Sequence, residues 1–159
     1  MSEPQAETIP AVVRRLQEHN AAWVAETRNF RGELTIVVPR EHIRAAAEFL
    51  CRDAELGFDF LSDLTGVDYF PAEPRFHLNY HIMSMARRER VRLQVRMASS
   101  HPVVESVVAV WPTANWHERE VFDMFGVRFE GHPDLRRILM PENWEGHPLR
   151  KDYPVEGYR

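Results

Sequence analysis

The chain has 159 residues, with 24 acidic residues against 20 lysines and arginines, so its formal net charge is −4 at pH 7. This length suits one domain with a substantial core, and the acidic balance argues against a general nucleic-acid binder, which needs a concentrated basic face. The single cysteine, Cys51, excludes an internal disulfide and an iron–sulfur cluster held by this chain alone, and no stretch approaches the roughly 18 apolar residues of a membrane span.

Two helices and a hairpin are predicted in the first third of the chain. Residues 1–8 are polar and acidic, unlike a signal peptide, and we expect them to form a flexible leader. Apolar residues spaced three and four apart predict a short helix over 9–20 and a clearer amphipathic helix over 41–53. Between them, two segments, 23–30 and 34–38, flank a glycine turn and predict a β-hairpin.

A strand is expected over 58–69, and the two segments that follow it alternate strictly between apolar and polar residues. This period of two places one set of side chains on a core and the other toward water or a partner. The apolar set comprises Phe76, Leu78, Tyr80, Ile82, Val91, Leu93, Val95 and Met97. The polar set comprises His77, Asn79, His81, Arg92, Gln94 and Arg96. The element order predicts an α+β fold, a two-layer sandwich of a mixed β-sheet with helices on one face.

The last helix is predicted over 116–125, and the chain changes character after it. The segment before it, 103–111, fits either a short strand or an extended connection. Gly126 suits the left-handed residue that often ends a helix. Beyond it, four prolines are spaced so that neither a helix nor a long strand fits between them. We therefore divide the chain into an α+β domain over 1–126 and an irregular, Pro-rich C-terminal arm over 127–159.

Glu118 is the odd residue of the last helix, because its carboxylate falls in the middle of the apolar arc. A carboxylate in that place needs a partner. One explanation is a capping box, with Asn115 as the N-cap and Glu118 as the third helical residue. The other is a buried ion pair, and the two roles can coexist. We expect Glu118 to be at least half buried and paired with an Arg, a His or helix N-terminal amides.

The same helix carries a pattern that resembles a known family. Eight residues match the signature of the C subunit, or thirty-kilodalton subunit, of proton-pumping NADH:quinone oxidoreductase, respiratory complex I. They are Glu118, Arg119, Glu120, Asp123, Met124, Phe125, His132 and Arg136. The stretches 136–141 and 144–154 also resemble this family, and 63–69 does so more weakly.

The resemblance implies a non-redox scaffolding subunit in the peripheral arm of a complex that passes electrons from NADH to quinone and couples this to proton translocation. The chain would then have no catalytic, cofactor or metal site of its own, and FMN and iron–sulfur clusters would belong to partner subunits. Its partners would be other complex I subunits, chiefly the D subunit and possibly the B subunit. It would be peripheral, on the cytoplasmic side of the cell inner membrane, and would contact the membrane only through the complex. The alternative is the equivalent subunit of a related membrane-bound hydrogenase or other donor:quinone complex.

The resemblance also marks residues for interface and fold-locking roles. These signature residues are Glu118, Arg119, Glu120, Asp123, Phe125, Gly126, His132 and Arg136. The C-terminal arm is too apolar to be disordered, so it needs a surface to lie on. We expect it to pack partly on this domain and partly on the D subunit. The residues proposed for this packing are Leu135, Arg137, Trp144, Arg150, Lys151 and Tyr153, with Trp144 as the best candidate for an energetic anchor.

Two rival functions use the same residues differently. A free-standing enzyme would use Glu118, Asp123 and His132 as an acid–base cluster, although such groups more often form ion-pair networks. A nucleic-acid module would use the sheet face bearing Arg92, Gln94 and Arg96, but the aromatic residues of those strands alternate away from that face. Glycine loops for nucleotides, a nucleophile elbow and compact metal-ligand spacings do not occur in the sequence. The residues alone therefore indicate a folded domain without catalytic equipment.

Overall fold

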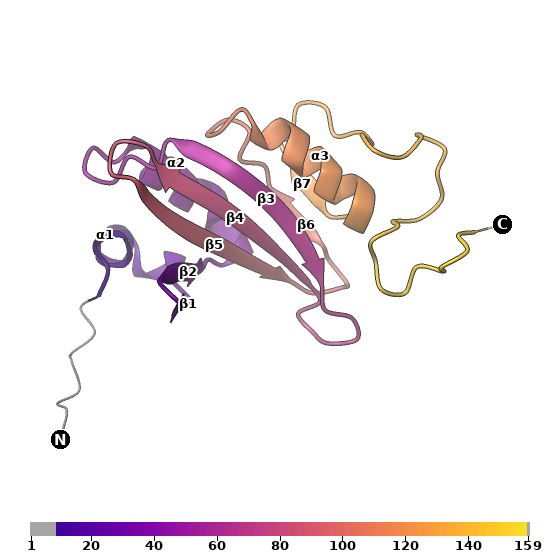
Figure 1. Cartoon of the computed structure of the whole chain (residues 1–159), viewed down its shortest axis with the longest axis horizontal. Helices are drawn as coiled ribbons and strands as arrows, with labels where there is room; N and C mark the ends of the chain where they lie inside the picture. Colours follow the sequence, from indigo (N-terminus) through magenta and orange to yellow (C-terminus); the bar gives the residue numbers. More distant parts are fainter. Residues whose placement is uncertain (1–8, 159) are drawn as a thin grey trace, which may run out of the picture.

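The computed structural model describes residues 9–158 and shows an α+β sandwich (Figure 1). The predicted leader over 1–8 lies outside the described residues. The helices are α1 (Ala11–His19), α2 (Ile43–Arg52) and α3 (Ala114–Phe125), with 3₁₀ turns η1 (Ala21–Trp23) and η2 (Arg40–His42). The strands are β1 (Glu26–Phe30), β2 (Glu33–Val37), β3 (Phe60–Asp68), β4 (Phe76–Ser84), β5 (Glu89–Met97), β6 (Val103–Glu105) and β7 (Arg128–Glu130).

Five strands form one mixed sheet in the order β1–β2–β5–β4–β3. Neighbouring strands pair antiparallel, except β2 and β5, which run parallel. Parallel neighbours need a long crossover, and here α2, β3 and β4 supply it. The helices contribute to one core on one face of this sheet, and Figure 1 shows α2 behind the strands and α3 beside β3. The predicted fold class is confirmed.

The alternating strands β4 and β5 form the centre of the sheet and line the core. Every second residue of β4, starting at Phe76, is buried, and the residues between are half-buried. Tyr80 of β4 and Leu93 of β5 lie opposite each other and are fully buried. Their side chains join those of the three helices in a single hydrophobic cluster. The period of two predicted this face correctly because only one face of the sheet is covered.

Several element boundaries differ from the sequence prediction. Trp23, predicted as the first residue of a strand, instead ends a 3₁₀ turn over 21–23, because its side chain is buried and Asn20 Oδ1 accepts the N–H of Ala22 at 3.0 Å. The second helix begins with the turn η2 and becomes α-helical at Ile43. The last helix, α3, starts at Ala114, two residues before the predicted position.

The segment over 103–111 is a short strand followed by a turn. β6 pairs parallel with β7, which lies beyond Gly126. Val127 and Phe129 are buried in the core, so the residues that hold the domain together continue past α3. From residue 131 to 158 the chain has neither helix nor strand, as expected for the C-terminal arm, and it runs past the end of α3 (Figure 1).

Gly66 lets α3 pack closely on the sheet. A Cβ atom at this position of β3 would lie 2.9 Å from a ring carbon of Phe125. Real Cβ atoms do not approach other atoms this closely, so any side chain here would push the helix away. The end of α3 is therefore fixed against β3, which positions the last turn for its contacts with the C-terminal arm.

Candidate functional site

The C-terminal arm satisfies the end of α3. A helix leaves its last four carbonyls without partners inside the helix. Here Gly126, which has the predicted left-handed conformation at φ 74°, donates its N–H to the first of them. The donors are Gly126 N–H to Phe122 O, His147 Nδ1 to Asp123 O at 2.9 Å, Arg137 Nη1 to Asp123 O at 3.3 Å, Leu149 N–H to Met124 O at 3.0 Å, and Arg150 Nε to Phe125 O at 2.6 Å. Four of these five donors come from the arm, so the arm is part of the folded domain.

Asp123 fixes an earlier part of the arm. Its side chain is fully buried, and Oδ2 accepts from the backbone N–H groups of Ile138, Leu139 and Met140 at 3.0, 2.7 and 2.9 Å. Oδ1 accepts from Arg137 Nη1 at 2.6 Å. Burial alone would raise the pKa of Asp123, but these hydrogen bonds lower it overall. An ionised carboxylate therefore organises three successive amides of the arm.

Two arginines hold the backbone of the arm through its carbonyls. Arg119 is nearly buried and donates to the carbonyls of Arg136 and Arg137 at 3.1 Å each. Arg137 donates in turn to the carbonyls of Trp144 and Gly146 at 2.9 Å each. A segment without regular structure cannot pair these carbonyls in a ladder, so side chains must satisfy them. The guanidinium groups supply the missing donors.

Glu118 is fully buried, as expected, but it does not form a capping box. The helix starts at Ala114, and Thr113 at the N-cap makes no side-chain cap. The carboxylate instead accepts from the hydroxyl of Ser106 and the N–H of Val107 at 2.7 Å each. The capping-box prediction is wrong because the helix begins earlier than predicted and the carboxylate reaches the segment after β6. Burial raises the pKa of Glu118 to about 7, against the lowering effect of these two bonds.

His132 ties the turn after β7 to α3. Its Nδ1 accepts the N–H of Asp134 at 3.0 Å, which leaves the ring proton on Nε2. Nε2 then donates to the carbonyl of Asn115 at 3.2 Å. The same Nε2 lies 3.9 Å from a carboxylate oxygen of Glu118, and both side chains are fully buried. The two signature residues are therefore neighbours, at a distance longer than a hydrogen bond.

A buried ion-pair cluster was missed by the sequence prediction. Arg75 makes two bonds of 2.9 Å to Asp68 and two, of 2.6 and 3.2 Å, to Asp152 of the arm. Asp68 also accepts the N–H of Lys151 at 2.8 Å. Burial alone would raise the pKa of Asp68, but the bonds from Arg75 and backbone donors lower it to about 2. The weak family resemblance over 63–69 includes Asp68, but no spacing in the sequence links it to the arm.

The sequence matches one protein family over most of its length. The family described as respiratory-chain NADH dehydrogenase, 30 Kd subunit, matches residues 36–159. The C subunit of NADH-quinone oxidoreductase from Roseiflexus castenholzii is 51% identical over 146 residues, which cover 92% of this chain and 84% of that protein. The C subunit from Geotalea uraniireducens is 44% identical over 152 residues, 96% of this chain and 91% of that protein. The chain belongs to this respiratory-chain NADH dehydrogenase subunit family.

Two solved structures share the fold of this family member. The trypsin-resistant fragment (1-134) of Nqo5 has a TM-score of 0.65 and 34% identity, over 77% of this chain and 97% of that chain. A chain of the membrane-bound sulfane sulfur reductase, an archaeal respiratory membrane complex, has a TM-score of 0.75 and 26% identity, over 91% of this chain and 84% of that chain. Within residues 9–158, no helix has both the length and the apolar character needed to cross a bilayer.

The acidic signature residues of this family member do not converge on one site. Glu118 binds the segment after β6, whereas Asp123 binds the C-terminal arm. A general acid–base pair needs groups that reach one substrate, and these two are each engaged with the protein. The polar sheet face is likewise internally paired, because Arg92 bonds to Glu33 and Arg96 to Glu26. The predicted acid–base cluster is therefore assembled only in part, because Glu118 and His132 are neighbours but Asp123 faces the arm.

The remaining signature and arm residues differ in how far they are exposed. Glu120 is exposed, Lys151 is exposed, and Arg136 forms an exposed pair with Asp134. Leu135 packs partly against the core, and the hydroxyl of Tyr153 accepts from Trp144 Nε1 at 3.0 Å. Five large apolar side chains of the arm are exposed, which we call the arm patch: Leu139, Trp144, Leu149, Val155 and Tyr158. Trp144, the expected anchor, is 41% exposed in this isolated chain.

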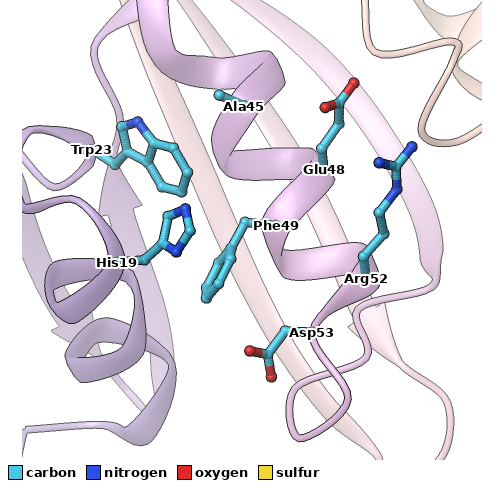
Figure 2. Close-up of a pocket in the computed structure, with 7 residues that line it drawn as sticks. All are labelled: His19, Trp23, Ala45, Glu48, Phe49, Arg52 and Asp53. Atoms are coloured by element: carbon cyan, nitrogen blue, oxygen red, sulfur yellow. The ribbon is translucent and has the colours of Figure 1, made fainter.

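A separate groove of about 560 Å³ lies between α1 and α2 (Figure 2). The ring of His19 stacks on Phe49 with centroids 4.3 Å apart, and Trp23 lies beside them. The acidic residues at its rim are already paired, because Glu48 bonds to Arg44 and Asp53 to Arg15. The groove contains none of the signature residues, so it is not part of the site around α3.

Proposed function

We propose that the chain is the non-redox scaffolding C subunit of the peripheral arm of an NADH:quinone oxidoreductase, which transfers electrons from NADH to quinone coupled to proton translocation. One observation carries this proposal. The signature side chains able to do chemistry are engaged in holding α3, the segment after β6 and the C-terminal arm together: Glu118, Arg119, Asp123 and His132. Groups saturated in this way position a surface rather than act on a substrate.

The proposed docking element is the C-terminal arm. Its backbone is held at the end of α3, at Asp123 and at the Asp68–Arg75 pair, so it is ordered before it meets a partner. A preordered segment loses little conformational entropy on binding. The arm patch then supplies the apolar contacts, with Trp144 as the anchor, because exposed Trp residues often dominate interfaces. We propose the D subunit of the complex as the main partner and the B subunit as a further one.

We assign no cofactor to this chain. FMN and iron–sulfur clusters are assigned to partner subunits, since Cys51 alone cannot supply the thiolates that a cluster needs. Membrane attachment is assigned to the complex as a whole. We infer a peripheral position on the cytoplasmic side of the cell inner membrane.

The alternative is the equivalent subunit of a related complex with another electron donor, such as a membrane-bound hydrogenase. The likeness to a chain of a membrane-bound sulfane sulfur reductase, at 26% identity, is the observation in its favour. The relatives at 44% and 51% identity are NADH-quinone oxidoreductase subunits and favour the main proposal.

Affinity purification of the tagged chain from detergent-solubilised membranes of its native host tests the proposal. We expect it to bring down large subunits that carry FMN and iron–sulfur clusters, in a complex that oxidises NADH with quinone. Point substitutions in the arm patch are more suitable variants for this test than a truncated chain, because truncation would also remove the donors that bind the last carbonyls of α3. A nickel–iron hydrogenase would support the alternative, and recovery of the chain alone or with nucleic acid would contradict both.

A further inference from the structure

Glu118 lies in a closed polar cluster inside the protein. Its carboxylate is fully buried and accepts two hydrogen bonds, from Ser106 Oγ and Val107 N–H. The hydroxyl of Tyr80, on β4, is also buried and has no hydrogen-bond partner among the described residues. Burial, together with the negative charge of Glu118, raises the pKa of Tyr80 well above its ordinary value. His132 completes the cluster, because its Nε2 lies 3.9 Å from Glu118 Oε2.

No arginine or lysine in the described residues forms an ion pair with this carboxylate. On α3 itself, His117 lies 3.6 Å from Asp63 of β3, and Arg119 donates to the arm. The titratable residue of β4 that senses the charge of Glu118 is Tyr80, whereas the segment after β6 contributes Ser106 to the cluster and the turn after β7 contributes His132. The imidazole is neutral in its present bonds, because Nδ1 accepts the N–H of Asp134. The carboxylate is therefore buried without a counter-ion.

A buried carboxylate without a counter-ion is easily protonated, because removal from water disfavours its charge. Burial raises the pKa of Glu118 to about 7, in spite of its two donors. The group therefore changes charge in the range where most proteins work, whereas an ordinary glutamate is already ionised there. The scaffolding function proposed above does not use this property.

We propose that Glu118, Ser106 and His132 form an internal proton-binding site whose occupancy is passed to the base of the C-terminal arm through His132. With the proton on Glu118 Oε2, the neutral carboxyl donates to Ser106 Oγ instead of accepting from it, and His132 Nε2–H donates to Asn115 O. When Glu118 releases its proton to solvent, the carboxylate becomes the stronger acceptor. His132 Nε2–H then turns from Asn115 O toward Glu118, and the Ser106 hydroxyl donates to the carboxylate.

The movement of His132 affects the arm because the same ring accepts the N–H of Asp134. A ring that turns toward Glu118 strains this bond, which closes the turn where the arm begins. Proton release should therefore loosen the turn, and proton uptake should close it. The device links the charge state of α3 to the start of the segment that carries the arm patch.

NMR on the isotope-labelled full chain tests the proposal without any partner subunit, so its outcome is independent of the proposed function. The side-chain carboxyl carbon of Glu118 should titrate with a midpoint near pH 7, and the Nε2 resonance of His132 should move with the same midpoint. The protection of the Asp134 amide against hydrogen exchange, corrected for intrinsic rates, should fall as the pH rises through that range. Glu118→Gln should abolish both pH-dependent changes, because a glutamine does not titrate.

Two further variants keep the test decisive. Glu120→Gln removes an exposed carboxyl two positions along the same helix and should leave the titration unchanged. Ser106→Ala removes a donor that favours the carboxylate, so the Glu118 midpoint should move to higher pH. A Glu118 carboxyl that shows no titration between about pH 5.5 and about pH 8.5 overturns the proposal. So does a His132 response that persists in Glu118→Gln.

Discussion

Replacing Asp123 measures how strongly α3 anchors the C-terminal arm. Asp123→Ala removes the acceptor of three backbone N–H groups and one partner of Arg137. Breaking a buried charge pair costs about 3–5 kcal/mol, and one hydrogen bond to a charged group is worth about 1.5–3 kcal/mol. The freed amides can regain water if the arm lifts, so the expected loss lies at the lower end, about 3 kcal/mol. Asp123→Asn keeps one acceptor oxygen but turns an amide NH₂ toward other donors, so about half that loss is expected.

Urea unfolding followed by circular dichroism measures the loss in free energy of unfolding, and trypsin cleavage within the arm reports its release. Glu120→Ala is the matched control, because Glu120 is an exposed carboxylate on the same helix. It should change the free energy of unfolding by less than about 0.5 kcal/mol. If Asp123→Ala behaves like this control and the arm stays as resistant to trypsin as in the wild type, the anchoring role of Asp123 is refuted.

Two further substitutions probe the contacts of the arm. Gly126→Ala should lower the free energy of unfolding by about 1 kcal/mol or more in excess of the loss caused by Gly131→Ala. Both glycines have positive φ, but only a Cβ at Gly126 would meet side-chain atoms of the arm, those of His147 and Arg150, at 2.6 Å. Equal losses in urea unfolding would contradict this packing. Asp68→Asn should remove part of the acid sensitivity: the pKa of Asp68 falls from its ordinary 3.8 to about 2 on folding, so its stabilisation is complete above about pH 4 and is lost as the pH drops through 2. Unfolding curves recorded between about pH 2 and about pH 6 measure this effect. At about pH 6 the variant should have a free energy of unfolding about 2 kcal/mol below that of the wild type, and at about pH 2 the two values should converge. A difference that does not change with pH would show that Asp68 does not titrate in this way.

The fold was predictable where local sequence signals agree with the tertiary structure. The alternation in β4 and β5 indicated the correct inner face because one side of the sheet is covered and the other is not. Gly126 indicated the correct helix end because its left-handed conformation is a local requirement. The resemblance to the complex I subunit family located α3 and the arm as the informative region before any geometry was known.

The contacts of the site were not predictable for two physical reasons. Asp68 meets Lys151 across 83 positions of sequence, and the arm has no periodicity that would reveal which of its amides face a carboxylate. The role of Glu118 was predicted wrongly because two roles require the same residue type near the start of a helix. One is a capping box, and the other is an acceptor for donors from another element. The choice between them was decided by Ser106 and Val107, which lie in another element.

We propose that this chain joins its respiratory complex through the surface of the C-terminal arm. The most direct measurement is the amount of chain bound to its complex, and the NADH:quinone reductase activity of the membranes, in a host that carries Trp144→Ala with Leu149→Ala. Both residues belong to the exposed arm patch, and Phe30→Ala, an exposed aromatic on the edge strand β1, is the matched control. Loss of a Trp anchor costs about 2 kcal/mol or more in binding, roughly a thirtyfold weaker interface. We expect the double variant to fold with wild-type circular dichroism but to be lost from the complex together with the activity, while Phe30→Ala remains assembled. A double variant that assembles fully and supports normal activity would show that the arm patch is not the docking surface.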